Sequence, residues 1–160
     1  MKKIFIALSV AAAGCVSTVS VPDNLKPTAN ESLARVVPAR GVQIYECRDA
    51  KWAFVAPDAQ LFDRAGRQIG SHYAGPVWEA ADGSKVIGAV KQRADAPAAG
   101  SIPWLLLGTK SVGGEGSFSK VTSIQRVATT GGVAPAGACA QNGEQARVPY
   151  TADYYFFTAK

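Results

Sequence analysis

The chain has 160 residues, 48% of them hydrophobic and 18% charged, and these proportions fit one globular domain with short tails rather than a disordered chain. The formal charge of +5 falls to +3 without Lys2 and Lys3, which lie in a segment that we expect to be removed. The other cations are scattered, which argues against nucleic-acid binding because phosphate recognition needs clustered Lys and Arg.

The first fourteen residues have the three-part build of an export signal. Two lysines precede an apolar run, residues 4–13, that is too short to span a bilayer as a helix. Ala12-Ala13-Gly14-Cys15 resembles the bacterial lipobox, in which cleavage exposes a cysteine that is then lipidated. We therefore expect a signal peptide over residues 1–14 and a lipid anchor on Cys15. An ordinary signal peptide cut near Ala13 or later is the alternative, and it would give a periplasmic or secreted protein.

The residue after Cys15 bears on location. Val16 stands where an aspartate would indicate retention at the inner membrane, so the lipoprotein resemblance implies the periplasmic side of the outer membrane. Residues 15–40 then read as a tether and lead-in, with three prolines among Ser, Thr and Asn. Within this segment, residues 24–37 could form a short helix or an extended arm.

From Gly41 onward the pattern predicts strands. Residues 42–47 alternate and are rich in β-branched and aromatic side chains, which is typical of a half-buried strand. Further on, Asp82-Gly83 is a strong hairpin signal. The remaining expected elements are a turn at 48–51, a return strand at 52–55 broken at 56–58, a strand at 85–90, a strand or one helical turn at 104–107, a strand within 118–127, and an aromatic strand at 154–157.

Short strands separated by turn signals, without a long amphipathic helix, indicate an all-β fold. We predict one domain over residues 41–160, built as a single antiparallel β sandwich or barrel with long loops.

The stretch from Gly70 to Glu79 holds the single histidine of the sequence, His72. In one interpretation His72 bonds a backbone group or a carboxylate of a neighbouring strand, and Trp78 fills the core. In the other, a polar group lies in an apolar pocket, as in many small-ligand sites. The candidate ligand-binding residues are His72, Tyr73, Trp78, Glu79 and Trp104.

No motif indicates a catalytic centre. The chain lacks a dinucleotide fingerprint, a P-loop and metal-ligand spacing, so we predict no catalytic residues, cofactor or metal. The favoured function is a non-enzymatic envelope module that binds a small molecule, a glycan or a protein partner. The alternative is a hydrolase or other secreted enzyme that uses His72 with nearby carboxylates, which are paired in the sequence as Glu79 with Asp82 and Asp58 with Asp63.

Cys47 and Cys139 remain once Cys15 is assigned to the anchor. In an oxidising compartment we expect them to form a disulfide, which would close a loop of roughly 90 residues and constrain the unfolded chain by about 4 to 5 kcal/mol. Two buried free thiols are the alternative.

Several motifs together resemble a family of exported bacterial and fungal proteins classed only as a domain of unknown function. They are GVQIYEC, HYAGPVWEAADGSKVIG, IPWLLL, IQRV and VPYTADYYFF, and the resemblance spans about residues 25–157. It implies a secreted β-rich domain in which the paired cysteines correspond to Cys47 and Cys139. It implies no catalytic residues.

Overall fold

The structure is a computed structural model that describes residues 19–160. The predicted signal peptide and Cys15 lie outside the described residues. The described chain contains one 3-10 helix and eight β-strands. They are η1 (Asp23–Leu25), β1 (Glu31–Arg48), β2 (Lys51–Phe62), β3 (Gln68–Tyr73), β4 (Val77–Ala80), β5 (Lys85–Ala94), β6 (Trp104–Ser111), β7 (Val121–Gly131) and β8 (Gln145–Ala159).

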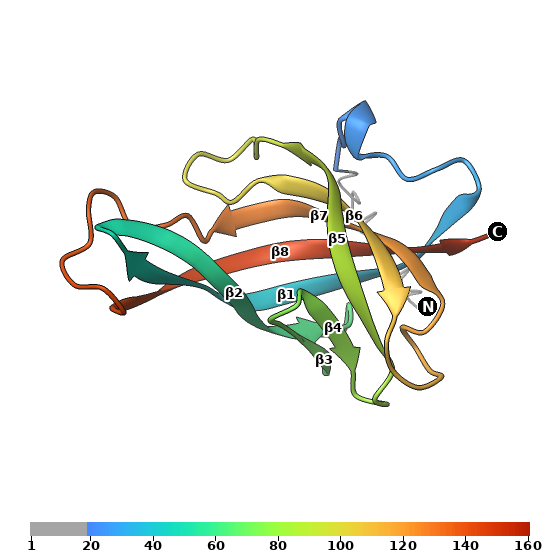
Figure 1. Cartoon of the computed structure of the whole chain (residues 1–160). Coiled ribbons are helices and arrows are strands. Elements are labelled where there is room, and N and C mark those ends of the chain that lie inside the picture. The colour runs from blue at the N-terminus through green and yellow to red at the C-terminus, as the bar shows by residue number, and fades with distance from the viewer. Residues whose placement is uncertain (1–18) are drawn as a thin grey trace, which may run out of the picture.

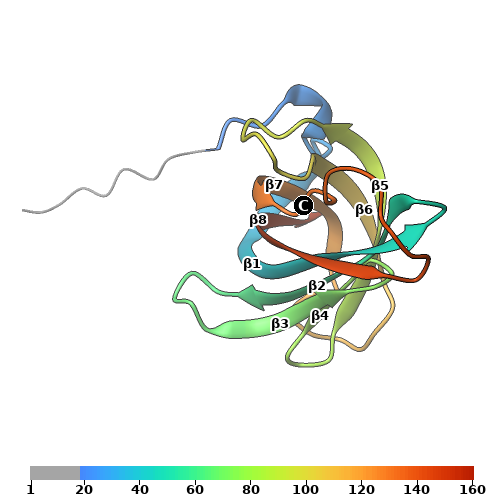
Figure 2. The same cartoon turned by 90° about the vertical axis from the view of Figure 1, so that its left-hand side faces the viewer.

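The eight strands form one closed antiparallel barrel (Figures 1 and 2). Each strand pairs with its neighbour in the chain, and β8 pairs back with β1, so the two longest strands run side by side (Figure 1). The predicted all-β antiparallel fold is therefore confirmed, and of the two predicted forms the structure has the barrel.

Alternation along β8 shows how the sequence fills the barrel. Tyr150, Ala152, Tyr154 and Phe156 belong to the large buried cluster, whereas Tyr155 packs against a second cluster. Successive side chains of a strand point to opposite faces, so the first set fills the interior and Tyr155 lies outside. The interior of an eight-stranded barrel is just wide enough for side chains to fill it or for one small ligand to enter.

The second cluster lies on the outside of the barrel. It consists of Leu25, Trp104, Leu106 and Val127, with Val19 and Val21 of the N-terminal segment packed against it. The helix η1 lies against β5 and β6 (Figure 1), and the side-chain Nε2 of Gln125 donates to the Leu25 carbonyl at 2.6 Å. The N-terminal segment therefore covers an apolar outer face.

Two predicted boundaries differ from the structure. The sequence predicts a lead-in up to residue 40, whereas β1 begins at Glu31 because its first half pairs with β8; Pro38, for example, faces Asp153. The predicted break at residues 56–58 is also wrong. There β2 continues past Pro57, which faces Gln43 close to a bulge at Val55 of β2. In both places pairing with a neighbouring strand overrides a local proline signal.

Gly41 allows β1 and β2 to approach closely. A Cβ atom at this position would lie against the backbone of Asp58 and Ala59, closer than real Cβ contacts allow. We expect Gly41→Ala to lower the free energy of unfolding by about 1 to 3 kcal/mol, because backbone atoms must shift to make room. Urea denaturation measures the change. In Gly114→Ala the added Cβ meets nothing within 4 Å, so this control should change stability by less than about 0.5 kcal/mol; equal losses in the two variants would contradict the steric account.

Candidate functional site

A row of inward-facing residues crosses the middle of the barrel. His72 of β3 lies opposite Ala59 of β2 on one side and Trp78 of β4 on the other, and Trp78 lies opposite Val86 of β5. Residues directly opposite one another share a face of the sheet, so the row belongs to the interior. The turn between β3 and β4 contains a cis Gly75–Pro76 peptide bond. That dipeptide is the tip of a hairpin whose register brings His72 beside Trp78.

His72 is held by aromatic packing and by one backbone hydrogen bond. Its ring stacks on Trp78 with centroids 4.1 Å apart, and Tyr154 meets it edge-on at 5.2 Å. Its Nδ1 lies 2.8 Å from the Val77 carbonyl oxygen. Because a carbonyl only accepts hydrogen bonds, Nδ1 carries the proton and Nε2 is an acceptor. Burial lowers the pKa of His72 to about 3, so the ring is neutral at pH 7.

The neutral His72 predicts a loss of stability in mild acid. The unfolded chain binds a proton at this side chain near pH 6.5, whereas the folded protein binds it only near pH 3. The free energy of unfolding should therefore fall by about 1.4 kcal/mol per pH unit as the pH drops from 6.5 to 4.5. Urea denaturation at pH 7, 6 and 5 measures the slope. The measured range, pH 7 to pH 5, lies above the ordinary pKa of carboxyl groups. The free energy of unfolding of His72→Gln should therefore change little across this range. Equal slopes for the wild type and His72→Gln would exclude His72 as the cause.

His72 and Trp78 line a pocket of about 180 Å³. A second pocket of about 380 Å³ adjoins it, and the two share Gln43, Phe54, Val90, Leu105 and Arg126. The inner pocket is otherwise lined by Pro57, Pro76, Leu107 and Tyr154, and the outer one by Tyr45, Arg93, Ile102 and Pro103. Phe54 and Val90 are 54% and 57% exposed, so they form the rim. The site is an apolar hollow in the barrel that opens to solvent.

Several polar side chains in this hollow were missed by the sequence-based prediction of the site, among them Arg126, Gln43 and Tyr154. Arg126 of β7 donates from Nε and Nη2 to the Pro103 carbonyl, at 3.1 and 2.8 Å. Gln43 of β1 is buried, and its Nε2 has no hydrogen-bond partner among the described residues. Tyr154 shares a hydrogen bond of 3.2 Å with the Tyr150 hydroxyl. Strand alternation in β1 is the signal that could have placed Gln43 on the same face as Tyr45.

The Nε1 atom of Trp78 also lacks a hydrogen-bond partner among the described residues. A buried donor without a partner costs about 1 to 3 kcal/mol, because it has lost its water. Gln43 and Trp78, which both line the pocket, thus each hold a buried N–H group without a partner, and so does Trp104 outside the pocket. Such groups are uncommon in native proteins and call for a specific explanation.

Tyr73 and Glu79, two of the predicted ligand-binding residues, lie on the opposite face of β3 and β4 from His72 and Trp78. The Tyr73 hydroxyl donates to Glu79, and Lys85 Nζ lies 3.4 Å from the same carboxylate. The hydrogen bond from Tyr73 is the main cause that lowers the pKa of Glu79. Neither residue lines the pocket. They form a cross-strand contact on the outside of the barrel.

Trp104, the fifth predicted ligand-binding residue, is buried but likewise does not line the pocket. It belongs to the outer cluster with Leu25, Leu106 and Val127, beneath the N-terminal segment. The inward-facing residues of β6 are its neighbours Leu105 and Leu107. The structure therefore brings together two of the five predicted residues, His72 and Trp78.

The other carboxylates of the enzyme hypothesis have structural partners. Asp82 accepts hydrogen bonds from the backbone and hydroxyl groups of both Ser84 and Ser117, and these bonds hold its pKa well below the usual range. Asp63 accepts from two backbone N–H groups and the Arg67 side chain. Asp58 pairs with Arg147 at 2.6 Å. These contacts stabilise turns and strand pairs at a distance from the His72 ring, and none of the three carboxylates lines the pocket.

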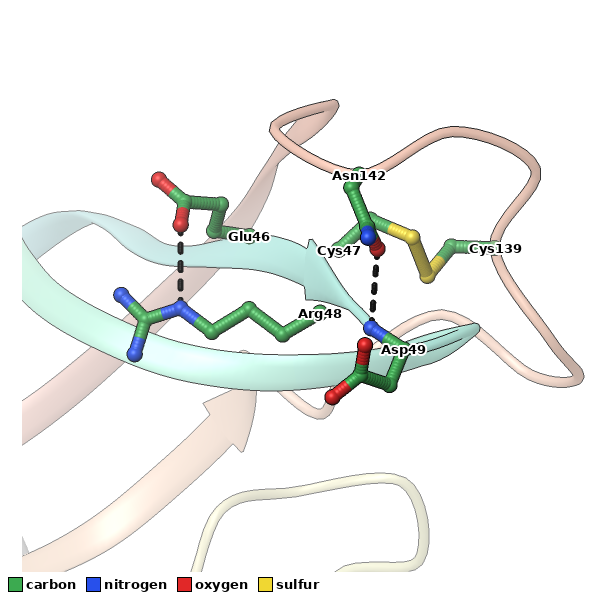
Figure 3. Close-up of a disulfide and its surroundings, with 6 residues drawn as sticks. All are labelled: Glu46, Cys47, Arg48, Asp49, Cys139 and Asn142. Carbon is green, nitrogen blue, oxygen red and sulfur yellow. Dashed lines mark hydrogen bonds and ion pairs between the residues drawn. A yellow bond between two sulfur atoms is a disulfide. The ribbon is translucent and has the colours of Figure 1, made fainter.

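The predicted disulfide between Cys47 and Cys139 is confirmed (Figure 3). It ties the end of β1 to the loop between β7 and β8. Beside it, Asn142 Oδ1 accepts a hydrogen bond of 2.8 Å from the backbone N–H of Asp49, and the Cys139 N–H donates to the Ala50 carbonyl (Figure 3 shows the first). Asp49 and Ala50 both have positive φ, as the two central residues of a type I′ hairpin turn require.

Two other kinds of site do not occur within residues 19–160. No helix there is long and apolar enough to cross a membrane. No group of three or more His, Cys, Asp or Glu side chains there could hold a metal ion.

These observations define a class of protein: an eight-stranded antiparallel barrel, closed by β1 and β8, with a small and mostly apolar interior pocket. The chain belongs to the family described as "Protein of unknown function (DUF3455)", whose model matches residues 27–158. This match confirms the resemblance to a domain-of-unknown-function family. No curated protein and no solved structure matches the chain.

Proposed function

We propose that the protein is an exported cell-envelope protein that binds a small molecule in the interior pocket of its barrel and carries out no catalysis. The observation that carries the proposal is the apolar hollow lined by His72 and Trp78, which enters the barrel and is open to solvent. At about 180 Å³, the inner pocket favours a small molecule over a glycan chain or a protein partner.

The surroundings of His72 support binding over catalysis. Its Nδ1 is committed to a backbone carbonyl and its ring is stacked on Trp78. A general base needs a pKa near the working pH, whereas the pKa of His72 is lowered to about 3. The neighbouring Glu79 lies on the outside of the barrel. The hydrolase alternative therefore has no supporting geometry at this pocket.

The binding proposal is tested by closing the mouth of the pocket. Val90 forms part of the rim, so Val90→Trp should block entry at little cost to the core. Val112→Trp is a matched control, because Val112 is 49% exposed and lines neither pocket. Each purified protein is incubated with a small-molecule extract of cells and analysed by affinity-selection mass spectrometry. We expect a compound that is retained by the wild type and by Val112→Trp but not by Val90→Trp.

Retention of the same compounds by all three proteins, or of none by the wild type, would contradict a binding function of this pocket. A hydrolase would instead release a changed compound, which the same mass spectra would show. Binding and turnover are thus separated in one experiment.

The envelope location is a separate part of the proposal and depends on Cys15. A lipid anchor at this residue would hold the barrel at a membrane surface, and multiple acylation would make that attachment firm. Cell fractionation should find the wild type with the membranes and Cys15→Ser in the soluble fraction or unprocessed. Equal fractionation, with a native N-terminus beyond residue 15, would exclude the anchor and leave the ordinary signal peptide.

A further inference from the structure

The pocket has an unbalanced positive charge. Among the described residues that line its inner and outer parts, the charged side chains are Arg126 and Arg93, and no Asp or Glu is present. His72 adds no charge at pH 7, because burial lowers its pKa to about 3. The hollow is thus cationic and otherwise apolar.

Arg126 is fixed in place but not neutralised. It lines both parts of the pocket, and its hydrogen bonds to the Pro103 carbonyl orient the guanidinium group. No carboxylate of the described residues lies within salt-bridge distance of it. A guanidinium has five N–H donors in a rigid fork, so two bonds to one carbonyl leave donors that match a carboxylate.

The other unsatisfied groups of the pocket are also donors. Gln43 is 2% exposed and Trp78 is 1% exposed, and both have an N–H group without a partner among the described residues. Both nitrogen atoms are almost fully buried, so the free donors of Arg126 remain for an acceptor atom of a ligand. A carboxylate only accepts hydrogen bonds, and its negative charge would balance the positive charge of Arg126.

The size and lining of the inner pocket limit the rest of the ligand. Its volume is about 180 Å³, and its walls include Trp78, Tyr154, Leu105 and Leu107. An engineered protein cavity of about 150 Å³ with a similar apolar lining accommodates benzene. One ring, or an aliphatic group of equal volume, therefore fits the inner pocket.

We propose that the natural ligand is a small organic carboxylate with a single ring-sized apolar body. The carboxylate binds Arg126, and the apolar body lies against Trp78 and Tyr154. This inference rests on the proposed function, because it names the chemical class of the molecule that the same pocket binds.

The test uses benzoate and benzamide, which have nearly the same shape and differ in charge. Isothermal titration calorimetry at pH 7 and constant ionic strength gives the affinity of each for protein purified from cells expressing the full chain. We expect the wild type to bind benzoate at least tenfold more tightly than benzamide. Arg126→Gln should abolish this preference and change benzamide affinity by less than threefold. Arg126→Lys should keep part of the preference, because it retains the charge but not the fork.

Two further variants separate a binding role from a structural one. Gln43→Met should raise the melting temperature of the free protein, because it removes a buried N–H group without a partner among the described residues, and it should keep the preference for benzoate, which depends on Arg126. Arg147→Gln removes an exposed arginine that pairs with Asp58 outside the pocket, so it should leave both affinities unchanged. If Arg126→Gln does not fold, the wild-type ratio and Arg126→Lys still decide the question.

The anion inference is overturned if the wild type binds the two probes equally, if it binds neither, or if the preference survives in Arg126→Gln. The Val90→Trp comparison then shows whether the proposed binding function fails as well. A neutral compound retained by the wild type and lost in Val90→Trp would leave the binding function standing. Retention of no compound would overturn both.

Discussion

Replacing both Cys47 and Cys139 by alanine is expected to lower the free energy of unfolding by about 4 to 5 kcal/mol. The two residues are 92 positions apart, and a cross-link across a loop of that length removes much of the entropy of the unfolded chain. Cys47 lies near the end of β1 and Cys139 in the loop between β7 and β8, and both are buried. Urea denaturation of oxidised wild type and of the double variant gives the difference.

The appropriate control removes a neighbouring contact and keeps the cross-link. Asn142→Ala deletes the hydrogen bond to the Asp49 N–H, which should cost only about 0.5 to 1.5 kcal/mol. If the double cysteine variant lost no more stability than Asn142→Ala, the disulfide would stabilise only the hairpin turn beside it. A constraint on the whole unfolded chain would then be excluded.

Trp78→Ala is expected to lower the free energy of unfolding by about 3 to 5 kcal/mol. Trp78 is fully buried, stacks on His72 and meets Tyr154 edge-on, so its removal leaves a large cavity in the middle of the barrel. Gly88 faces the same ring, so the opposite wall has no side chain that could fill the space. Urea denaturation at pH 7 measures the loss.

Trp78→Phe tests whether the ring or its N–H group matters. Phenylalanine keeps an aromatic ring against His72 and removes the Nε1–H that has no partner among the described residues. The loss should therefore stay below about 1.5 kcal/mol, because the gain from deleting an unsatisfied donor offsets part of the lost packing. A loss as large as that of Trp78→Ala would mean that Nε1 contributes to stability, which its surroundings do not explain.

The fold was predictable where local chemistry decides it. Alternation in residues 42–47 and the Asp82-Gly83 turn correctly indicated antiparallel hairpins, and the cysteine pair was identified from the sequence and the family resemblance. The beginning of β1 was not predictable, because its pairing with β8 joins segments at opposite ends of the described chain. Long-range pairing leaves no local signal, and Pro38 locally argues against a strand.

The candidate site was predictable only in part. His72 and Trp78 were identified as neighbours in one stretch, but the register that places them face to face depends on the hairpin at Gly75–Pro76. Tyr73 and Glu79 were included for their closeness in sequence, although alternation places each on the other side of the strand from its neighbour. Arg126 was missed because the apolar spacing in residues 118–127 fits neither strand nor helix, and β7 contains two register shifts.

The closure of the barrel by β1 and β8 has a consequence for how the chain folds. Seven of the eight pairings join neighbouring strands and can form as each hairpin is completed, but β1 must wait for the last strand. Until then an 18-residue strand has one open edge, with unpaired backbone groups that can recruit another chain. The interior also lacks Tyr154 and Phe156 at that stage. The period of greatest aggregation risk therefore ends only when β8 docks, and that high-contact-order step sets the pace of folding.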